Sequence, residues 1–343
     1  MRGIRRWVWV VALAVVLALL GGYGWYRLSD TGKRWRYEDR LQSYCGGVLP
    51  YEETVALTGL PSDPATGLPH DVAEGTPKQG WDFCWIKSMD IVITTARIPT
   101  GSADDLRFYL PRLRAEALPT PMGGGWRGVT DGVNTTVVLP CTNRAHAIAA
   151  TAQLTEEEPD KSVSRRVAEL TAATAVNAAD RWGCESKPGA RLEVVDPASG
   201  SSTPQEADGT CAGVPWTRNK RIDTITETPA DRLAPLATCL LDEADTDDGY
   251  RLEASFGPFA QRERNDSLHS DLTEKSAGGG GEAGEFFWAS AACPGDGPRA
   301  LFQISPQSGT SGDPSFARAA LVAFAKRAAE RHDCNSLQLP AAP

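Results

Sequence analysis

Histidine is scarce in this sequence, and its cysteines lack the spacing of metal ligands. The four histidines form no H-x-x-x-H pattern, and no two of the eight cysteines form a C-x-x-C pair. Structural zinc sites are usually built from such closely spaced ligands. These absences argue against zinc, and we expect neither a bound metal nor a cofactor. The histidines are His70, His146, His269 and His332.

Sequence signatures of common enzyme classes are also missing. There is no G-x-S-x-G, H-E-x-x-H, phosphate-loop or dinucleotide-binding pattern. The glycine run 278–281 is not followed by G-K-[S/T], and it is typical of a loop. We therefore predict no catalytic residues and a protein that is not an enzyme. A hydrolase whose Ser, His and acidic groups are dispersed along the chain is the enzymatic alternative.

Two acidic clusters deserve a physical interpretation. Asp245, Asp247 and Asp248 resemble a calcium loop, but the glycine and the bidentate glutamate of that loop do not fall at the required positions. An acidic hairpin turn is the better interpretation. Residues 156–158 and Asp160 precede an expected helix, where acids suit the positive end of the helix dipole.

Positive charge is in deficit over most of the chain. The formal charge is -9, with 35 basic and 44 acidic residues. Residues 1–26 contribute Arg2, Arg5 and Arg6 and no acid, so the rest of the chain is still more acidic. Such a surface repels nucleic acid phosphates. We expect no nucleic acid partner, whereas cations, basic proteins and neutral ligands stay compatible with the charge.

The N-terminal segment has the properties of a membrane anchor. The run 7–26 has no charged residue and at 1.5 Å per residue spans ~30 Å, about the thickness of the hydrocarbon core. Trp and Tyr lie at both ends of the run, where aromatic side chains favour the membrane interface. A cleaved signal peptide is the alternative, but Leu19-Leu20-Gly21-Gly22 offers only a weak cleavage site.

The eight cysteines indicate disulfides, and disulfides indicate that this part of the chain lies outside the cytosol. All of them follow the apolar run, and their number is even. Disulfides persist outside the cytosol. We therefore expect the N-terminus to be cytoplasmic and the rest of the chain to be extracellular, attached to the cell membrane by a single span. The cysteines are Cys45, Cys84, Cys141, Cys184, Cys211, Cys239, Cys293 and Cys334.

The cysteines also expose an internal repeat. Gaps of 39, 57 and 43 residues separate the first four, and gaps of 28, 54 and 41 separate the last four. The local sequences agree in the same order, for example Cys45-Gly-Gly-Val with Cys211-Ala-Gly-Val. Four cysteines per copy allow three pairings. We favour Cys45–Cys84, Cys141–Cys184, Cys211–Cys239 and Cys293–Cys334, and the crossed pairings stay open.

The expected fold class is α+β: an N-terminal transmembrane helix and two tandem copies of a small antiparallel sheet packed with helices, each with two disulfides. In copy one we expect helices at 50–57, 104–117 and 162–182 and strands at 82–87, 91–98, 133–139 and 145–154. In copy two we expect strands at 250–256, 286–292 and 299–304, a loop at 261–284 and a helix at 314–332. The expected boundaries are a cytoplasmic tail 1–6, an anchor 7–26, a juxtamembrane segment 27–37, repeats 38–186 and 210–338, a linker 187–209 and a tail 339–343.

The first copy carries a pattern of Cys-Gly (Cys45, Gly46), Thr-Gly-Leu (58–60) and Phe-Cys-Trp (83–85). It resembles small cell-envelope lipoproteins and sensor domains of actinobacteria, from which it differs in having an apolar helix in place of a lipidated cysteine. The resemblance implies an envelope location and an α+β fold, and it carries over no catalytic residue.

Three functional classes follow. The first is a non-catalytic binding module that presents a surface or an inter-copy cleft to a small ligand or an envelope protein. The second is a structural or assembly accessory of an envelope or secretion machine, and the third is the dispersed-site hydrolase. Ten tryptophans are available either for the core or for a pocket, and we single out Trp126, Trp182, Trp216 and Trp288. Packing beside a disulfide is the more common role for such residues.

Overall fold

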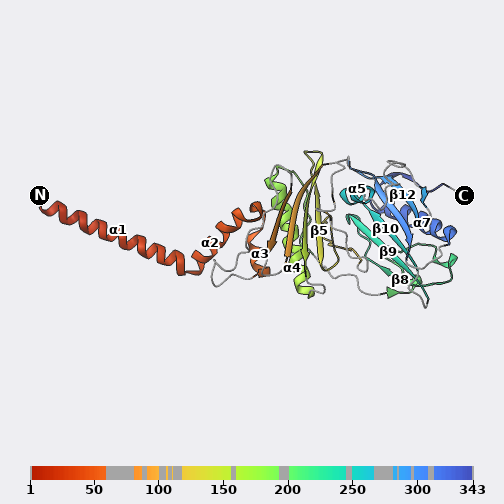
Figure 1. The fold of residues 1–343 in the computed structure, drawn as a ribbon, viewed down its shortest axis with the longest axis horizontal. Helices are drawn as coiled ribbons and strands as arrows, with labels where there is room; N and C mark the ends of the chain where they lie inside the picture. The colour runs from red at the N-terminus through yellow and green to blue at the C-terminus, as the bar shows by residue number, and fades with distance from the viewer. Residues whose placement is uncertain are drawn as a thin grey trace.

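The computed structural model describes a mixed α+β protein with an N-terminal helix and two antiparallel sheets that pack face to face (Figure 1). Helices cover the outer face of each sheet, so the order of layers is helix, sheet, sheet, helix. The residues described are 2–58, 81–86, 91–99, 106, 110, 118–155, 160–192, 201–244, 249–265, 281–283, 286–294, 297–307 and 313–341.

The first helix, α1 (Arg2–Leu28), extends away from the folded body (Figure 1). Its segment Trp9–Leu28 is long and apolar enough to cross a membrane. Its large side chains are exposed, for example Trp7 at 74% and Leu20 at 62%. An apolar helix without a protein partner needs an apolar surrounding, which a membrane or the secretion machinery provides.

A second helix, α2 (Asp30–Ser43), follows at once, where we expected only a juxtamembrane segment at 27–37. Ser29 caps it by accepting a hydrogen bond from the Gly32 N–H at 3.0 Å. Gly32 passes so close to the Tyr26 carbonyl that a Cβ atom at this position would clash with the oxygen. Tyr37 and Leu41 lie one turn apart and are buried in the first core, so α2 ties the apolar helix directly to the first sheet.

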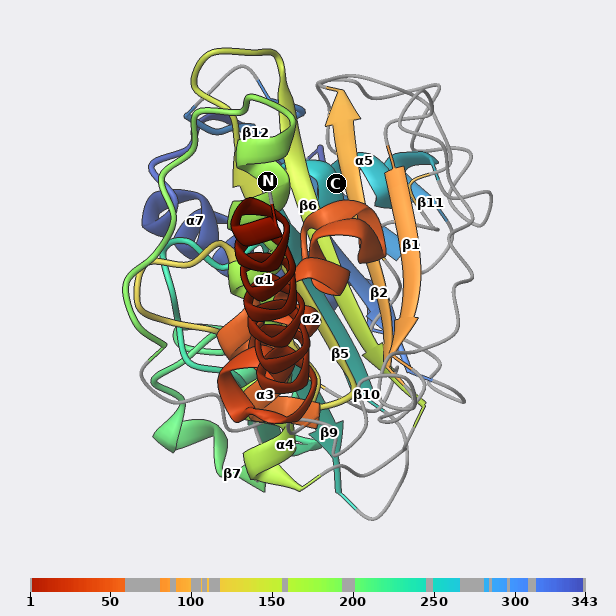
Figure 2. The ribbon, with the colours of Figure 1, turned by 90° about the vertical axis from the view of Figure 1, so that its left-hand side faces the viewer.

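The first sheet has the strand order β1-β2-β6-β5-β4-β3. On its outer face lie α3 (Tyr51–Thr58) and α4 (Lys161–Arg181), where α4 begins at the N-cap Asp160. Figure 2 shows these helices in front of the strands, with the second sheet behind. The strands are β1 (Trp81–Ile86), β2 (Ile91–Pro99), β3 (Thr120–Pro121), β4 (Gly128–Thr130), β5 (Asn134–Pro140) and β6 (His146–Leu154).

The second sheet has the order β11-β12-β13-β10-β9-β8-β7, and β14 pairs with β12. Its outer face is covered by α7 (Pro314–Arg331), which begins at the N-cap Asp313 with a proline at its first position. The strands are β7 (Ser201–Ser202), β8 (Ile222–Glu227), β9 (Leu236–Glu243), β10 (Gly249–Ser255), β11 (Gly281–Ala283), β12 (Phe286–Ala292), β13 (Ala300–Pro306) and β14 (Asn335–Gln338). Because β7 lies within 187–209, the expected linker contributes a strand to this sheet.

The two sheets share a topology over five strands. The order β1-β2-β6-β5-β4 in the first corresponds to β9-β10-β13-β12-β11 in the second, in the same chain order. In each unit the last long strand is followed by a helix, α4 or α7. Two residues after the last residue of each helix, the chain adopts a left-handed backbone, at Gly183 or at Asp333. The next residue is a cysteine whose N–H donates to a carbonyl of the last helical turn at 2.8 Å.

Disulfides join cysteines within each unit and in the order we favoured. In each unit one bond fastens the N-terminal cysteine to the first hairpin, and the other ties the end of a central strand to the end of the long helix. The Cα separations are 5.4 Å for Cys45–Cys84, 5.1 Å for Cys141–Cys184, 5.0 Å for Cys211–Cys239 and 3.9 Å for Cys293–Cys334.

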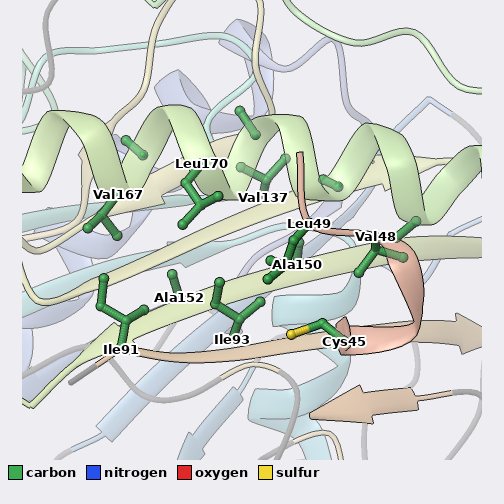
Figure 3. Packing of buried hydrophobic residues seen from close by; sticks show 14 of the residues in the cluster. Cys45, Val48, Leu49, Ile91, Ile93, Val137, Ala150, Ala152, Val167 and Leu170 are labelled. Carbon is green, nitrogen blue, oxygen red and sulfur yellow. The ribbon is translucent and has the colours of Figure 1, made fainter. Parts of the chain in front are cut away.

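The first core lies between α4 and the sheet (Figure 3). Val167 and Leu170 of α4 face Ile91, Ile93 and Ala150 of the strands, and all are at most 1% exposed. Alternate residues of the same strands point to the other face, as the twofold repeat of a strand requires. Ala96, Ile98 and Ala149 belong to that second face. The first sheet is therefore buried on both sides.

A short helix, α5 (Pro258–Asn265), lies at the junction between the sheets (Figure 1). We expected a loop at 261–284, and this expectation was wrong for residues 261–265 of α5 and for the short strand β11. Phe259 is fully buried in the cluster that joins the sheets, while Ala260 packs with Trp288 and Leu301 of the second sheet. The joining cluster comprises Ala96, Ile98, Leu106, Leu110, Val129, Val138, Ala147, Ala149, Leu236 and Phe259.

Most expected elements agree with the structure to within one or two residues. The expected strand 286–292 coincides with β12, and the expected helix 314–332 ends one residue beyond α7. The expected helix 104–117 lies almost wholly outside the described residues.

Phe259 should hold the two sheets together. Replacing it with Ala removes a fully buried ring from the junction, which typically costs about 3–5 kcal/mol. We expect Phe259→Ala to raise hydrogen exchange in the inner-face strands β2 and β6 of the first unit and to lower the urea midpoint. Phe316→Ala is the control, because Phe316 is a residue of α7 that packs in the second core only. Unchanged exchange in β2 and β6 would contradict the role of Phe259.

Candidate functional site

A cavity of about 290 Å³ lies at the junction between the sheets. Its floor is the inner face of the second sheet, formed by β9, β10 and β13. Arg262 and Glu263 of α5 and Pro119 of the first unit complete the lining together with Phe286. The floor residues are Leu236, Ala237, Thr238, Arg251, Glu253, Ala254, Ser255, Gln303 and Ser305.

Strand register places the polar floor residues in one row. Thr238 of β9 pairs with Glu253 of β10, and Glu253 pairs with Gln303 of β13. Cross-strand neighbours point to the same face of a sheet, so the three side chains lie next to one another. Arg251 pairs with Ser305, and both lie two residues from the Glu253–Gln303 pair, so they point to the same face of the sheet. Ser255 lies two residues from Glu253 in the other direction along β10 and also points to that face. The cavity floor is thus polar although it is covered by another sheet.

The charged groups of the lining are paired with one another. The Arg251 Nε atom lies 2.8 Å from Glu253 Oε1, and Arg262 Nε donates to Glu263 Oε1 at 3.0 Å. A third bond runs from the Arg262 Nη1 to the carbonyl of Leu110 in the first unit at 2.8 Å. Among the described residues of the lining, two arginines and two glutamates balance in formal charge.

Three neutral polar side chains in the lining are buried and have no hydrogen-bond partner within the described residues. Thr238, Ser255 and Gln303 are 2%, 3% and 4% exposed. None of their polar atoms is among the fully enclosed atoms that lack a partner, so water in the cavity can hydrogen-bond to them. A molecule that enters the cavity and displaces this water must therefore offer hydrogen-bonding groups to the same side chains.

The four tryptophans are divided between core and surface. Trp126 is 8% exposed, and Trp288 is 5% exposed beside the junction. Trp182 and Trp216 are partly buried against the first and second cores. Trp126 also borders an open hollow of about 550 Å³ between α3, α4 and the segment 188–192. None of the four lines the cavity between the sheets.

The described histidines do not meet the cavity. His146 begins β6 and His332 follows α7, and neither is in the cavity lining. His70 and His269 lie outside the described residues. Burial, Arg97 and Arg144 lower the pKa of His146. In the described ranges we therefore find no serine, histidine and carboxylate converging in this cavity.

The acidic clusters give no cation site in the part of the chain that the structure describes. Asp245, Asp247 and Asp248 and residues 156–158 lie outside it. Asp160 caps α4 by accepting from the Ser162 N–H at 2.8 Å, and that bond lowers the pKa of its carboxyl. Among the described residues, no group of three His, Cys, Asp or Glu side chains is arranged to hold a metal ion.

Sequence reasoning did not identify the residues of this cavity. Arg251, Glu253 and Ser255 alternate with buried residues in one strand, which is the pattern of a strand with one face in water. Arg262 and Glu263 fall in the segment expected to be a loop. Comparison of the chain with protein families, with curated proteins and with solved structures gave no match.

His332 provides a pH test of the packing at the end of α7. Its ring stacks on Phe256 at a centroid distance of 3.6 Å. Burial, followed by Arg331, Arg127 and Arg232, lowers the pKa of His332 to about 3. The unfolded chain therefore takes up a proton at a higher pH than the folded chain does. We expect the free energy of unfolding to fall as the pH drops from about 6.5 towards 3.

Urea unfolding of the wild type and of His332→Phe across this pH range measures the effect. The phenylalanine keeps the stack on Phe256 and has no titrating group, so its pH dependence should be smaller. An NMR titration of His332 in the folded protein should show the neutral ring at pH 5. Parallel pH profiles for the two proteins would contradict the lowered pKa.

Proposed function

We propose that this protein is a membrane-anchored, extracytoplasmic module of a bacterial cell envelope that binds a small ligand without chemically changing it. The observation that carries the proposal is the cavity between the two sheets, whose lining holds three neutral polar side chains that make no hydrogen bond to another described side chain. Binding sites commonly lie between domains and contain a few convergent polar groups in a largely apolar lining. We assign no catalytic residue to the cavity.

The location is supported by two independent features. The exposed apolar helix suits a retained anchor with a cytoplasmic N-terminus, and four disulfides suit an oxidising compartment. A retained anchor is also favoured by α2, because Tyr26 and Arg27 of α1 accept hydrogen bonds from Arg36 of α2. The apolar helix is in this way continuous with the folded body.

We further propose that the two units are tandem copies of one ancestral domain, as the cysteine pattern suggests. Support comes from the shared order of five strands and from the equivalent positions of the disulfides. The resemblance to actinobacterial envelope domains remains part of this proposal. A duplicated domain creates a new site at the junction of its copies, which is where the cavity lies.

An assembly accessory is the second candidate. The open hollow beside Trp126, lined by Ala172, Ala173 and Val176 of α4, is a surface on which another envelope protein could dock. The two candidates differ in which surface is occupied. Binding that depends on the cavity supports the first, and a co-purified envelope protein that protects α4 from hydrogen exchange supports the second.

Location and disulfides can be measured on the same sample. We expect the full chain to stay in the membrane pellet after carbonate extraction and to be cut by protease added to spheroplasts. Non-reducing peptide mapping with thiol alkylation should recover the four bonds within the units and no free thiol. Recovery in the soluble fraction would contradict the anchor, and alkylated cysteines would contradict the extracytoplasmic location.

A ligand screen tests the binding function. A ligand at 100 times its Kd stabilises a native protein by about 2.7 kcal/mol, which raises the Tm by several degrees. We expect fractions of small molecules from the cell envelope to raise the Tm of the wild type but not that of Ser305→Trp, whose indole would occupy the cavity. Ser201→Trp is the control, since Ser201 is exposed on β7. No stabilising fraction, or equal stabilisation of both variants, would exclude ligand binding in the cavity.

A further inference from the structure

We infer that the ligand of the cavity is a small uncharged molecule that carries several hydroxyl or amide groups, such as a monosaccharide. The inference rests on the proposed function, because it names the class of molecule that the same cavity takes. Three properties of the lining support it: the pairing of its charges, the chemistry of its unpartnered groups, and its size.

The charges of the lining select against ions. A charged ligand loses its hydration on entering and needs a protein charge of opposite sign to compensate. Here Arg251 faces Glu253 and Arg262 faces Glu263 at hydrogen-bond distance. An anion would approach each arginine together with its glutamate, and a cation would approach each glutamate together with its arginine. Neither gains a net attraction, whereas a neutral molecule meets no repulsion.

The unpartnered groups select for hydroxyls and amides. Gln303 offers an amide with donors and an acceptor, and Thr238 and Ser255 each offer a hydroxyl that both donates and accepts. These three side chains lie on two adjacent rows of the sheet, so a single ligand would have to present several polar groups to one face. An apolar molecule would leave all three without partners at the full cost of their burial.

The size and remaining walls select for a small ring. At about 290 Å³, the cavity lies at the lower end of ligand sites, which run from ~300 to 1,000 Å³. Leu236, Phe286 and Pro119 provide apolar surface beside the polar row. A sugar ring likewise has separate polar and apolar surfaces, with hydroxyl groups at its edge and C–H groups on its faces.

Calorimetric titration of the full chain in lipid nanodiscs tests the inference, because sugar detergents would compete. The probes are glucose and N-acetylglucosamine as neutral molecules, inorganic phosphate and lysine as charged molecules, and octanol as an apolar molecule. We expect a neutral probe to bind, and Gln303→Leu to weaken its binding by about 10-fold through the loss of hydrogen bonds. Thr238→Val, which keeps the shape of the side chain, should act in the same direction.

A matched control separates binding from folding. Gln303 has no partner within the described residues, so leucine at this position should cost little stability. Thr174→Val removes a buried hydroxyl that also has no partner, but in α4 of the first unit, away from the cavity. Its affinity for the neutral probe should equal that of the wild type.

The outcomes separate the inference from the function on which it rests. Binding of phosphate, lysine or octanol that Ser305→Trp blocks, without binding of either neutral probe, would overturn the inference and leave the binding function standing. A neutral probe that binds Gln303→Leu and Thr238→Val as tightly as the wild type would also overturn it. If neither neutral probe binds at high millimolar concentration, the inference is wrong, and the screen of envelope fractions decides the function separately.

Discussion

The apolar contact between the inner faces of the two sheets is the interaction on which the rest of the structure depends. In each unit, helices cover the outer face of the sheet. The inner face is covered by the sheet of the other unit. Phe259 and Leu236 of the second unit meet the alanine-rich inner face of the first, where small side chains allow close approach. The contact is incomplete, because the inner face of the second sheet is polar over part of its area. The cavity lies over that polar part, so the same packing both joins the units and creates the site.

Much of the fold could be predicted from the sequence because its signals are local. The alternation of apolar residues marks β10, a nearly continuous apolar run marks β12, and alanine-rich stretches mark α4 and α7, each with an acidic N-cap. The order of the cysteines favoured the pairing that the structure contains. The helix α2 was missed because its sequence is strongly polar, although Tyr37 and Leu41 carry the one-turn spacing of a buried stripe. The helix α5 was missed because it has eight residues and polar neighbours, and only Pro258 at its first turn marks it.

The candidate site could not be predicted, and the reason is physical. In β10, Arg251, Glu253 and Ser255 alternate with Tyr250, Leu252 and Ala254, which is the pattern of a strand with one face in water. Whether that polar face meets solvent or another protein surface depends on contacts with residues more than a hundred positions away. Local patterns carry no information about such contacts. The idea of a cleft between two copies came from the repeat, but the residues that line it emerge only from the packing of the sheets.

Arg262 shows that the cavity and the junction are one structural unit. Arg262 is 5% exposed and lines the cavity beside Glu263, and its guanidinium donates to the Leu110 carbonyl of the first unit. The first unit is in turn joined to the apolar helix through α2, whose Tyr37 and Leu41 lie in its core. A continuous series of packed elements thus leads from the N-terminal helix through the first sheet to α5 and the cavity floor. Since packed interiors resist deformation, a molecule that filled the cavity would stabilise the junction as well as its own site. The second unit would then be held more firmly against the unit that carries the anchor.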